Sequence, residues 1–340
     1  MSKIPVAVIG ASGYTGLELI KILLNHPYFE IAFLGGSEGA IAAQEAHPSL
    51  RGVIDANIQK SDPSAIAASA KIAFLAVPHK RAAALAKELI ARGVKVVDLS
   101  ADYRLEQATY ENTYGVSHDD AENLRSAIYG LPELVGSEAI ANAKLIANPG
   151  CYPTASILAA LPFLPYTDLS APIIIDAKSG VSGAGKQCVE RTHFVTVNEN
   201  CFTYSPIVHR HAPEIEEKLS VAAKTPISIV FAPHLLPITR GMLASVYLRL
   251  KTPIDDPTQT AREFYADNAF VRVREESVQI KWVAGTHYCD LFARVKGDAL
   301  LVQTAIDNLL RGAASSAVAN ANLVAALPYE TALPVIAYAP

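Results

Sequence analysis

Three glycines near the N-terminus constrain the fold of this chain more than any other feature. Gly10, Gly13 and Gly16 stand directly between an apolar run at 4–9 and a helical pattern of apolar residues at 17–24. Glycines at this spacing allow a tight turn, and they let backbone N–H groups approach a pyrophosphate at the N-terminus of the following helix. We therefore predict that the chain begins with a strand, a dinucleotide-binding loop and a helix.

The first half of the chain continues this alternation. A helical pattern covers 82–91, and further apolar runs typical of buried strands stand at 29–34, 71–77, 94–99 and 144–147. Apolar strands separated by helices indicate a parallel sheet that is covered on both faces. We predict an α/β fold with a Rossmann-type, doubly wound parallel sheet.

Beyond residue 150 the pattern changes to strands with few helices between them. An apolar helix at 151–164 is followed by strand-like segments at 173–178, 228–233, 243–250, 278–283 and 288–295. They indicate an α+β domain with a mixed or antiparallel sheet. An alanine-rich stretch at 300–327 is expected to be one long helix that returns to the first domain. We therefore predict a dinucleotide-binding domain at 1–149 and 300–340, and a catalytic domain at 150–299.

The composition excludes several classes of protein. The length of 340 residues exceeds the usual size of one domain. A net charge of −4 disfavours a nucleic-acid partner. No apolar run approaches the ~18 residues of a membrane span, and the N-terminal apolar stretch is too short for a signal peptide. Four widely spaced cysteines without a CxxC pair suit a reduced, cytoplasmic protein, and no metal-ligand spacing is present.

One of these cysteines is placed for nucleophilic catalysis. Cys151 follows the segment 148–150 (Asn-Pro-Gly) and begins the apolar helix. At a helix N-terminus the dipole and the free N–H groups favour the reactive thiolate. The alternative is a buried structural cysteine, which is the usual role of a free cysteine. We interpret the other three, Cys188, Cys201 and Cys289, as packing residues.

A base for this nucleophile is expected in the segment His209-Arg210-His211-Ala-Pro-Glu214. Two imidazoles, a guanidinium and a carboxylate within six positions could supply an acid/base, an anion clamp and an orienting group. The alternative is a solvated turn that enters a helix at 214–219. No histidine has a spacing typical of metal ligands, so we predict no metal site.

Two further loops invite an anionic ligand. The segment 179–186 follows a strand, is rich in hydrogen-bond donors and ends in a lysine. In the segment 234–241, Arg240 stands beside a glycine and could hold a carboxylate or a phosphate. The alternative for the first of these loops is a flexible hairpin connection.

Taken together, eight segments in one order resemble the N-acetyl-gamma-glutamyl-phosphate reductase family, NADPH-dependent enzymes of arginine biosynthesis. The segments are GASGYTGLEL at 10–19, DLSADYRL at 98–105, YGLPEL at 129–134, ANPGCYPT at 147–154, KSGVSGAGK at 178–186, HRHAPEI at 209–215, FAPHLLPITRGM at 231–242 and GTHYCD at 285–290. The resemblance implies a fold similar to glyceraldehyde-3-phosphate and aspartate-semialdehyde dehydrogenases. It also implies a homo-oligomer, either a dimer or a tetramer.

The resemblance further implies a reaction. Cys151 attacks the acyl phosphate of N-acetylglutamyl phosphate, expels phosphate and forms a thioester, which NADPH reduces to N-acetylglutamate semialdehyde. We predict His211 as the acid/base partner, with His209 as the alternative. The substrate-binding residues expected from the same segments are Arg104, Ser179, Arg210, Glu214 and Arg240.

We predict NADP as the cofactor. Ser37, after the second strand, would suit a 2′-phosphate, whereas Glu38 would repel one; the family often has Ser-Arg there. His287 and the pair at 315–316 also depart from the family pattern. The cofactor-binding residues that we expect are Gly10, Ser12, Gly13, Tyr14, Thr15, Gly16, Ser37, Pro78, Ser100, Ser182 and Gly183.

Two other functions are compatible with parts of the sequence. One is the reduction of a related acyl phosphate, aminoadipyl or aspartyl. The HRHAPEI and NPGCYPT segments disfavour the aspartyl substrate and discriminate poorly against the aminoadipyl one. The other is a non-catalytic dinucleotide sensor, which would have no need of a thiolate.

Overall fold

The computed structural model describes residues 3–37 and 39–338 of the chain. The chain divides into two compact units. The first comprises Met1–Pro149 and Ala313–Pro334, and the second comprises Gly150–Gly312 and Val335–Pro340. Within the described residues, no helix is long and apolar enough to cross a membrane.

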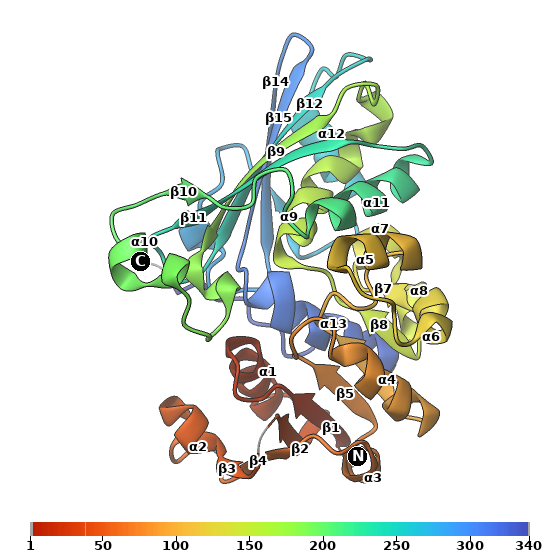
Figure 1. Ribbon diagram of the computed structural model, residues 1–340. Helices are drawn as coiled ribbons and strands as arrows, with labels where there is room; N and C mark the ends of the chain where they lie inside the picture. Colours follow the sequence, from red (N-terminus) through yellow and green to blue (C-terminus); the bar gives the residue numbers. More distant parts are fainter. Residues whose placement is uncertain (1–2, 38, 339–340) are drawn as a thin grey trace. The chain divides into compact units, whose positions relative to one another are not determined.

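The first unit contains an eight-stranded sheet in the order β3-β4-β2-β1-β5-β6-β8-β7 (Figure 1). Its strands are β1 (Ile4–Ile9), β2 (Phe29–Gly36), β3 (Ile41–Ala42), β4 (Asn57–Lys60), β5 (Ile72–Leu75), β6 (Lys95–Asp98), β7 (Ile128–Tyr129) and β8 (Leu145–Ala147). All neighbouring pairs are parallel except β3 and β4. From β1 the chain proceeds to β2 on one side and returns to β5 on the other. The carboxyl ends of β1 and β5 therefore form a topological switch point, where α/β sheets bind ligands.

Helices cover both faces of this sheet. Ala7 and Ala73 pack with residues of α3 and α4, while Val8 and Phe74 point to the opposite face and are also fully buried. Helix α1 contacts α13. The helices of this unit are α1 (Tyr14–Leu24), α2 (Ala43–Ala46), α3 (Pro63–Ser69), α4 (Ala82–Ala91), α5 (Gln107–Tyr114), α6 (Ala121–Ser126), α7 (Pro132–Val135), α8 (Ser137–Ala141), α13 (Ser315–Val324) and the 3₁₀ turn η1 (Pro48–Leu50).

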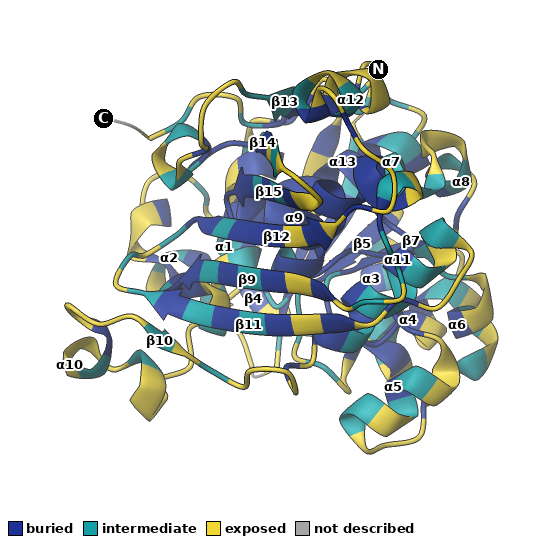
Figure 2. Ribbon diagram, turned by 90° about the horizontal axis from the view of Figure 1, so that it is seen from above, coloured by how far each residue is buried: buried dark blue, intermediate teal, exposed yellow. Residues whose placement is uncertain are grey.

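The second unit contains a seven-stranded mixed sheet in the order β10-β11-β9-β12-β15-β14-β13. Its strands are β9 (Ile173–Gly180), β10 (Phe202–Thr203), β11 (Ile229–Leu236), β12 (Met242–Arg249), β13 (Val271–Val273), β14 (Cys289–Lys296) and β15 (Ala299–Ile306). The pairs β9–β11 and β13–β14 are parallel, and the other pairs are antiparallel. Figure 2 shows buried and exposed residues alternating along β9, β11 and β12, as expected when helices cover one face of a sheet only.

Three helices contact the strands of this second sheet: α9 (Cys151–Ala160), α11 (Ala212–Ala223) and α12 (Pro257–Phe264). All residues of α9 except the first are buried, so this helix forms the centre of the unit. The shorter elements are α10 (Phe194–Val197), the 3₁₀ turns η2 (Leu161–Tyr166), η3 (Val181–Ala184), η4 (Glu190–Thr192) and η5 (Ile280–Trp282), and the π-helix η6 (Leu310–Ala314). The predicted fold class, a Rossmann-type sheet followed by an α+β domain, is confirmed.

The prediction of one long helix at 300–327 is wrong. Residues Ala299–Ile306 form β15, which pairs with β12 on one side and β14 on the other. Backbone pairing along two complete strands overrides the helix propensity of alanine and leucine. Residues 300–312 consequently group with the second unit and not with the first, and so do residues 335–338.

The strand expected at 278–283 is also absent. These residues form a loop with the 3₁₀ turn η5, in which Val278 and Val283 are buried together with Phe292. Their apolar side chains pack on the sheet without belonging to it, and a short apolar run does not distinguish these two cases.

Candidate active site

The second unit contains a cavity of about 300 Å³. Six of the predicted site residues line it: Cys151, Ser179, Gly183, His209, Arg210 and His211. The other lining residues are Tyr152, Ala184, Arg191, Tyr204, Ser205, Val208 and Leu235. Residues separated by up to 84 positions thus surround the thiol.

The position of Cys151 follows from the way in which α9 begins. Gly150 is the N-cap, with φ −70° and ψ 160°. Its carbonyl oxygen accepts the Thr154 N–H at 2.9 Å and the Thr154 hydroxyl at 2.8 Å. Cys151 is therefore the first helical residue, where the N-terminal dipole favours a negative charge.

The predicted base His211 directly precedes helix α11, which also holds α9. The His211 carbonyl accepts the Ile215 N–H at 3.0 Å and so starts α11. One turn into this helix, the buried Glu214 accepts the Gly150 N–H through Oε1 at 3.0 Å. Glu214 was expected to bind substrate, but it is not among the cavity-lining residues. Its carboxylate instead fixes the start of the cysteine helix against the histidine helix.

The two histidines are not equivalent. The His211 backbone N–H donates to His209 Nδ1 at 3.1 Å, which places the proton of the neutral His209 ring on Nε2. Burial, followed by the charges of Arg210 and Arg191, lowers the pKa of His209 to about 4. His209 is therefore uncharged at neutral pH. Its ring centroid lies 5.0 Å from that of His211.

An aromatic wall that the sequence analysis missed surrounds these rings. The Tyr204 hydroxyl donates to the Tyr152 hydroxyl at 3.0 Å, and Tyr152 donates to the His234 carbonyl at 3.2 Å. The Tyr152 ring centroid lies 5.6 Å from His209 and 5.9 Å from His211. Burial raises the pKa of Tyr204 to about 12, so this hydroxyl stays protonated. Tyr152 could have been predicted as a site residue, because it directly follows the predicted nucleophile in the sequence. No sequence pattern marks Tyr204.

A second guanidinium at the cavity was also missed. Arg191 lines the cavity with Arg210, and its Cζ lies 5.8 Å from the centroid of the Tyr204 ring. Arg191 comes from the turn η4, and no motif in the sequence distinguishes it. Two guanidinium groups therefore face a cavity that also contains a cysteine.

The first unit places the glycine loop as predicted for a dinucleotide site. Gly10 has φ +85°, and a Cβ there would lie 2.1 Å from the Ala76 oxygen. A Cβ at Gly16 would lie 2.3 Å from the Gly10 oxygen, and Gly13 is the N-cap of α1. Ser12, Tyr14 and Thr15 complete this turn and the first turn of α1. The loop thus fits a pyrophosphate bound by backbone N–H groups.

The remaining predicted cofactor residues of this unit stand at the same edge of the sheet. Ser37 and Pro78 are exposed and follow β2 and β5, while Ser100 follows β6. The Ser100 side chain is buried, and its hydroxyl donates to Asp98 Oδ2 at 2.8 Å. Glu38 lies outside the described residues. The sequence analysis missed His47, whose Nε2 lies 2.8 Å from the Ala11 oxygen and supports the glycine loop.

Arg104, which was predicted to bind substrate, is buried in the first unit. Its Nε donates to the Asn148 oxygen at 2.8 Å, and its Nη2 donates to the Leu99 oxygen at 2.7 Å. These two bonds tie together the loops that follow β6 and β8.

Known proteins resemble the chain over its whole length. Residues 5–143 match the family described as semialdehyde dehydrogenase, NAD binding domain, and residues 151–308 match the semialdehyde dehydrogenase dimerisation domain. An N-acetyl-gamma-glutamyl-phosphate reductase of Wolinella succinogenes is 53% identical over 340 residues, which is 100% of both chains. The chain belongs to the N-acetyl-gamma-glutamyl-phosphate reductase family. Another family member, from Campylobacter curvus, is 54% identical over 336 residues and 99% of each chain.

Solved structures of more distant proteins share the fold of this reductase family. Aspartate semialdehyde dehydrogenase II from Vibrio cholerae, complexed with ASA, superposes with a TM-score of 0.73 at 17% identity, covering 96% of this chain and 99% of that chain. The aspartate semialdehyde dehydrogenase of Candida albicans, with NADP, has a TM-score of 0.68 at 15% identity, covering 96% and 99%.

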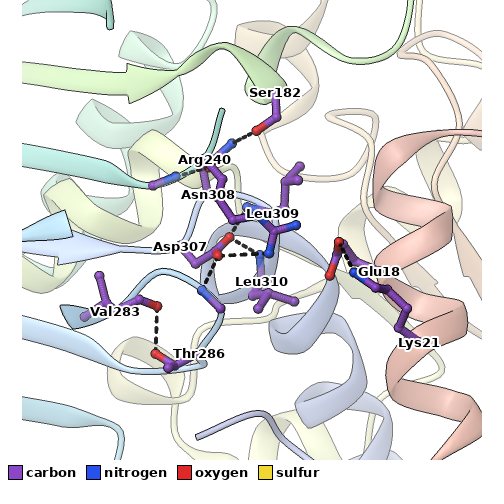
Figure 3. Close-up of polar contacts among 12 residues, drawn as sticks. Glu18, Lys21, Ser182, Arg240, Val283, Thr286, Asp307, Asn308, Leu309 and Leu310 are labelled. Carbon is purple, nitrogen blue, oxygen red and sulfur yellow. Dashed lines mark hydrogen bonds and ion pairs between the residues drawn. The ribbon is translucent and has the colours of Figure 1, made fainter. Parts of the chain in front are cut away.

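Ser182 and Arg240, like Glu214, are predicted site residues of the second unit that do not line the cavity. The Ser182 hydroxyl accepts a hydrogen bond from Asn308 Nδ2 at 3.0 Å, and Arg240 Nη1 lies 3.2 Å from Asp307 Oδ2 (Figure 3). Both are held by consecutive residues at the end of β15.

The cysteines other than Cys151 are not all packing residues as predicted. Cys289 is fully buried in β14, but Cys188 and Cys201 are exposed in the loops around α10. This segment has few buried side chains to pack against them. Among residues 3–37 and 39–338, no three His, Cys, Asp or Glu side chains are grouped closely enough to hold a metal ion.

Proposed function

We propose that this chain reduces N-acetyl-L-glutamyl 5-phosphate to N-acetyl-L-glutamate 5-semialdehyde and phosphate in arginine biosynthesis. One observation carries the proposal: a cysteine at a helix N-terminus shares a cavity with two histidines and two arginines. The names of relatives that are more than half identical over the whole chain support the substrate.

The chemistry begins at Cys151. Its thiolate attacks the acyl carbon, the bond between this carbon and the phosphate oxygen breaks, and a thioester forms as phosphate leaves. The start of α9 favours the thiolate, and the bond between Glu214 and Gly150 holds that start in place. A bound nicotinamide cofactor supplies the hydride that reduces the thioester. The C–S bond then breaks, which releases the semialdehyde and regenerates the thiolate.

We propose His211 as the residue that moves the proton. His209 accepts a bond through Nδ1 and stays neutral, so it orients its neighbour and does not carry charge. His211 would take the proton of the thiol, give it to the oxygen of the hemithioacetal, and take it back as the C–S bond breaks and the aldehyde forms.

The substrate carries a carboxylate and a phosphate, and we propose that guanidinium groups bind both. Arg210 and Arg191 line the cavity, and Ser179 adds a hydroxyl. That Arg104 and Arg240 contact the substrate directly remains a prediction. Arg104 already donates to the Leu99 oxygen, and Arg240 is already paired with Asp307. We propose that Glu214 contributes indirectly, by accepting the Gly150 N–H and so holding the start of α9 in place.

We propose NADP as the cofactor, held by the glycine loop, with Ser37, Pro78 and Ser100 beside it and with Ser182 and Gly183 at the nicotinamide end. Ser37 is exposed at the end of β2, where a 2′-phosphate would be recognised. A free 2′-hydroxyl would instead favour an acid at that position. Fluorescence titration compares the two cofactors: a lower dissociation constant for NAD than for NADP would contradict this choice.

We also propose that the enzyme is a homo-oligomer of the cytoplasm. Val230, Ile174 and Tyr247 lie opposite one another on β11, β9 and β12 and are 37%, 47% and 45% exposed. An apolar row across an uncovered sheet face suits a second copy of the chain, as the match to a dimerisation domain suggests. A reducing cytoplasm would keep Cys151 available.

The test of the reaction runs it in reverse. The purified chain receives N-acetylglutamate semialdehyde, NADP and phosphate, and the absorbance of NADPH is followed. We expect turnover with this substrate, none in Cys151→Ser, and normal turnover in Cys188→Ser, the matched exposed cysteine. At neutral pH iodoacetamide should label Cys151 before the other cysteines, and bound acyl phosphate should protect it.

Parallel assays with aspartate semialdehyde and aminoadipate semialdehyde define the substrate. Faster turnover of either would overturn the proposed assignment. If no semialdehyde reacts while NADP still binds, the chain is a dinucleotide sensor and the proposal is wrong.

A further inference from the structure

Two consecutive buried residues at the end of β15 connect several loops of the second unit. Asp307 is 0% exposed and Asn308 is 2% exposed. They stand between the last strand of the sheet and the π-helix Leu310–Ala314. Figure 3 shows the contacts that radiate from them. None of the motifs in the sequence includes either residue.

The Asp307 carboxylate joins three segments. Its Oδ1 accepts the Leu309 and Leu310 N–H groups at 2.9 and 3.1 Å, which starts the π-helix. Its Oδ2 accepts the Gly285 N–H at 2.7 Å and lies 3.2 Å from Arg240 Nη1. A fully buried carboxylate needs such donors, because an unpaired buried charge is strongly unfavourable.

The Asn308 amide joins the Arg240–Gly241 loop to one more loop, that of Ser182. Its Oδ1 accepts the Gly241 N–H at 2.6 Å, and its Nδ2 donates to the Ser182 hydroxyl at 3.0 Å. The same two loops bond directly, from the Ser182 N–H to the Thr239 oxygen at 3.0 Å. Gly183, the next residue after Ser182, lines the cavity. Asn308 therefore fixes the position of a loop that forms one wall of the active site.

The backbone of Asp307 is linked to the nucleophile through Gly312, which packs against Cys151. Its carbonyl oxygen accepts the Gly312 N–H at 2.9 Å. A Cβ at Gly312 would lie only 2.6 Å from the Cβ of Cys151 and 3.0 Å from its Cα. The π-helix thus packs bare backbone against the cysteine, and π-helical turns are frequent at functional sites. A shift of Asp307 would move the surface on which Cys151 rests.

We propose that Asp307 and Asn308 are positioning residues for the reductase reaction, and this rests on the proposed function. Neither residue is among those that line the cavity. They act through three groups: Arg240, the Ser182–Gly183 wall and the Gly312 backbone behind Cys151. Their combined effect is to hold the reactive sulfur and the surrounding anion-binding groups in one arrangement.

The experiment compares Asn308→Ala and Asp307→Asn with the wild type. We measure KM for the semialdehyde and kcat per reactive Cys151 thiol. We also measure the rate at which iodoacetamide alkylates Cys151 without substrate or cofactor. Misplacement by about 1 Å can cost roughly a hundredfold in rate. We therefore expect kcat per reactive thiol to fall about tenfold or more, together with an altered alkylation rate. Asn308→Asp keeps the oxygen that accepts the Gly241 N–H, and its second oxygen can accept from the Ser182 hydroxyl, so it should recover most of the activity.

A matched control separates positioning from stability. Asn322 is a fully buried asparagine of the first unit whose Nδ2 donates to the Tyr329 and Thr331 oxygens. Asn322→Ala should lower the melting temperature but leave kcat per reactive thiol and the alkylation rate unchanged. If Asn308→Ala and Asp307→Asn behave like this control, the proposal is overturned.

Two outcomes need separate treatment. If Asn308→Ala does not fold, Ser182→Ala removes the same hydrogen bond from the loop side, and an unchanged alkylation rate in that variant contradicts the proposal. If the wild type lacks reductase activity, the proposed function fails; the alkylation rates of the variants then still report whether Cys151 is positioned from β15.

Discussion

At the scale of single residues, the hydrogen bond between the two histidines supports the roles that we propose for them. His209 Nδ1 accepts the His211 backbone N–H, and burial beside Arg210 and Arg191 lowers its pKa to about 4. A histidine with so low a pKa stays uncharged at neutral and alkaline pH. His211 is the other histidine that lines the cavity, so we propose it as the group that moves the proton.

Replacement of each histidine by asparagine tests this assignment. We expect His211→Asn to lower kcat by roughly a hundredfold or more, because an acid/base group is lost. It should also remove one ionisation from the pH profile of kcat/KM. His209→Asn should lower kcat less and leave the pKa values of the profile in place. His193→Asn, a replacement of an exposed histidine of the same unit, is the control. A larger loss in His209→Asn than in His211→Asn would reverse the roles.

At the scale of elements, two helix starts build the sites, and both begin at glycine. Gly150 precedes the nucleophile in α9, and Gly13 precedes the first turn of α1. Neither N-cap has a side chain that could satisfy the first N–H groups of its helix. Each helix therefore presents its N-terminal dipole to the thiol or to the expected pyrophosphate.

Gly16→Ala tests the loop at the start of α1. The new Cβ would lie 2.3 Å from the Gly10 oxygen and 2.8 Å from the Ala11 Cα, so the backbone must shift. Overpacking of this kind costs about 1–3 kcal/mol. If the cost falls on the bound form, the dissociation constant for NADPH should rise about tenfold or more. Fluorescence titration measures it.

The matched control for this loop is Gly39→Ala, since a Cβ there meets nothing within 4 Å. It should bind NADPH like the wild type. Alkylation of Cys151, in the second unit, should be the same in both variants. Unchanged NADPH affinity in Gly16→Ala would contradict the placement of the pyrophosphate at this loop.

At the scale of the whole molecule, one face of the second sheet carries apolar side chains that a single copy of the chain leaves exposed to solvent. The row of Val230, Ile174 and Tyr247 continues in register to Leu301 on β15. Helices cover the opposite face, but in this row Val230, Ile174 and Tyr247 are exposed and Leu301 is half-buried. An uncovered apolar sheet face is stabilised when another copy of the chain buries it.

Tyr247→Glu tests the proposed oligomer. A carboxylate in a buried apolar interface is unfavourable, so we expect light scattering to report a lower mass than for the wild type at the same micromolar concentration. Tyr28→Glu is the control, because Tyr28 is 42% exposed in the first unit and lies far from this sheet in the sequence. A monomeric wild type, or an unchanged mass in Tyr247→Glu, would refute the interface.

The sequence by itself determined the features that depend on near neighbours along the chain. The run at 4–9, the glycines at 10, 13 and 16 and the segment at 148–151 are short patterns, and each encodes its own turn or helix start. Their order along the chain was sufficient to identify the family and the fold class, because both depend on local motifs in succession.

Only the tertiary structure decided the features that depend on distant partners. Residues 299–306 are a strand because β12 and β14 pair with them, although their composition favours a helix. Glu214 holds Gly150 across 64 positions, and Asp307 reaches Arg240 across 67. Such contacts leave no periodicity in the sequence, since their energy comes from burial and pairing that exist only in the folded chain.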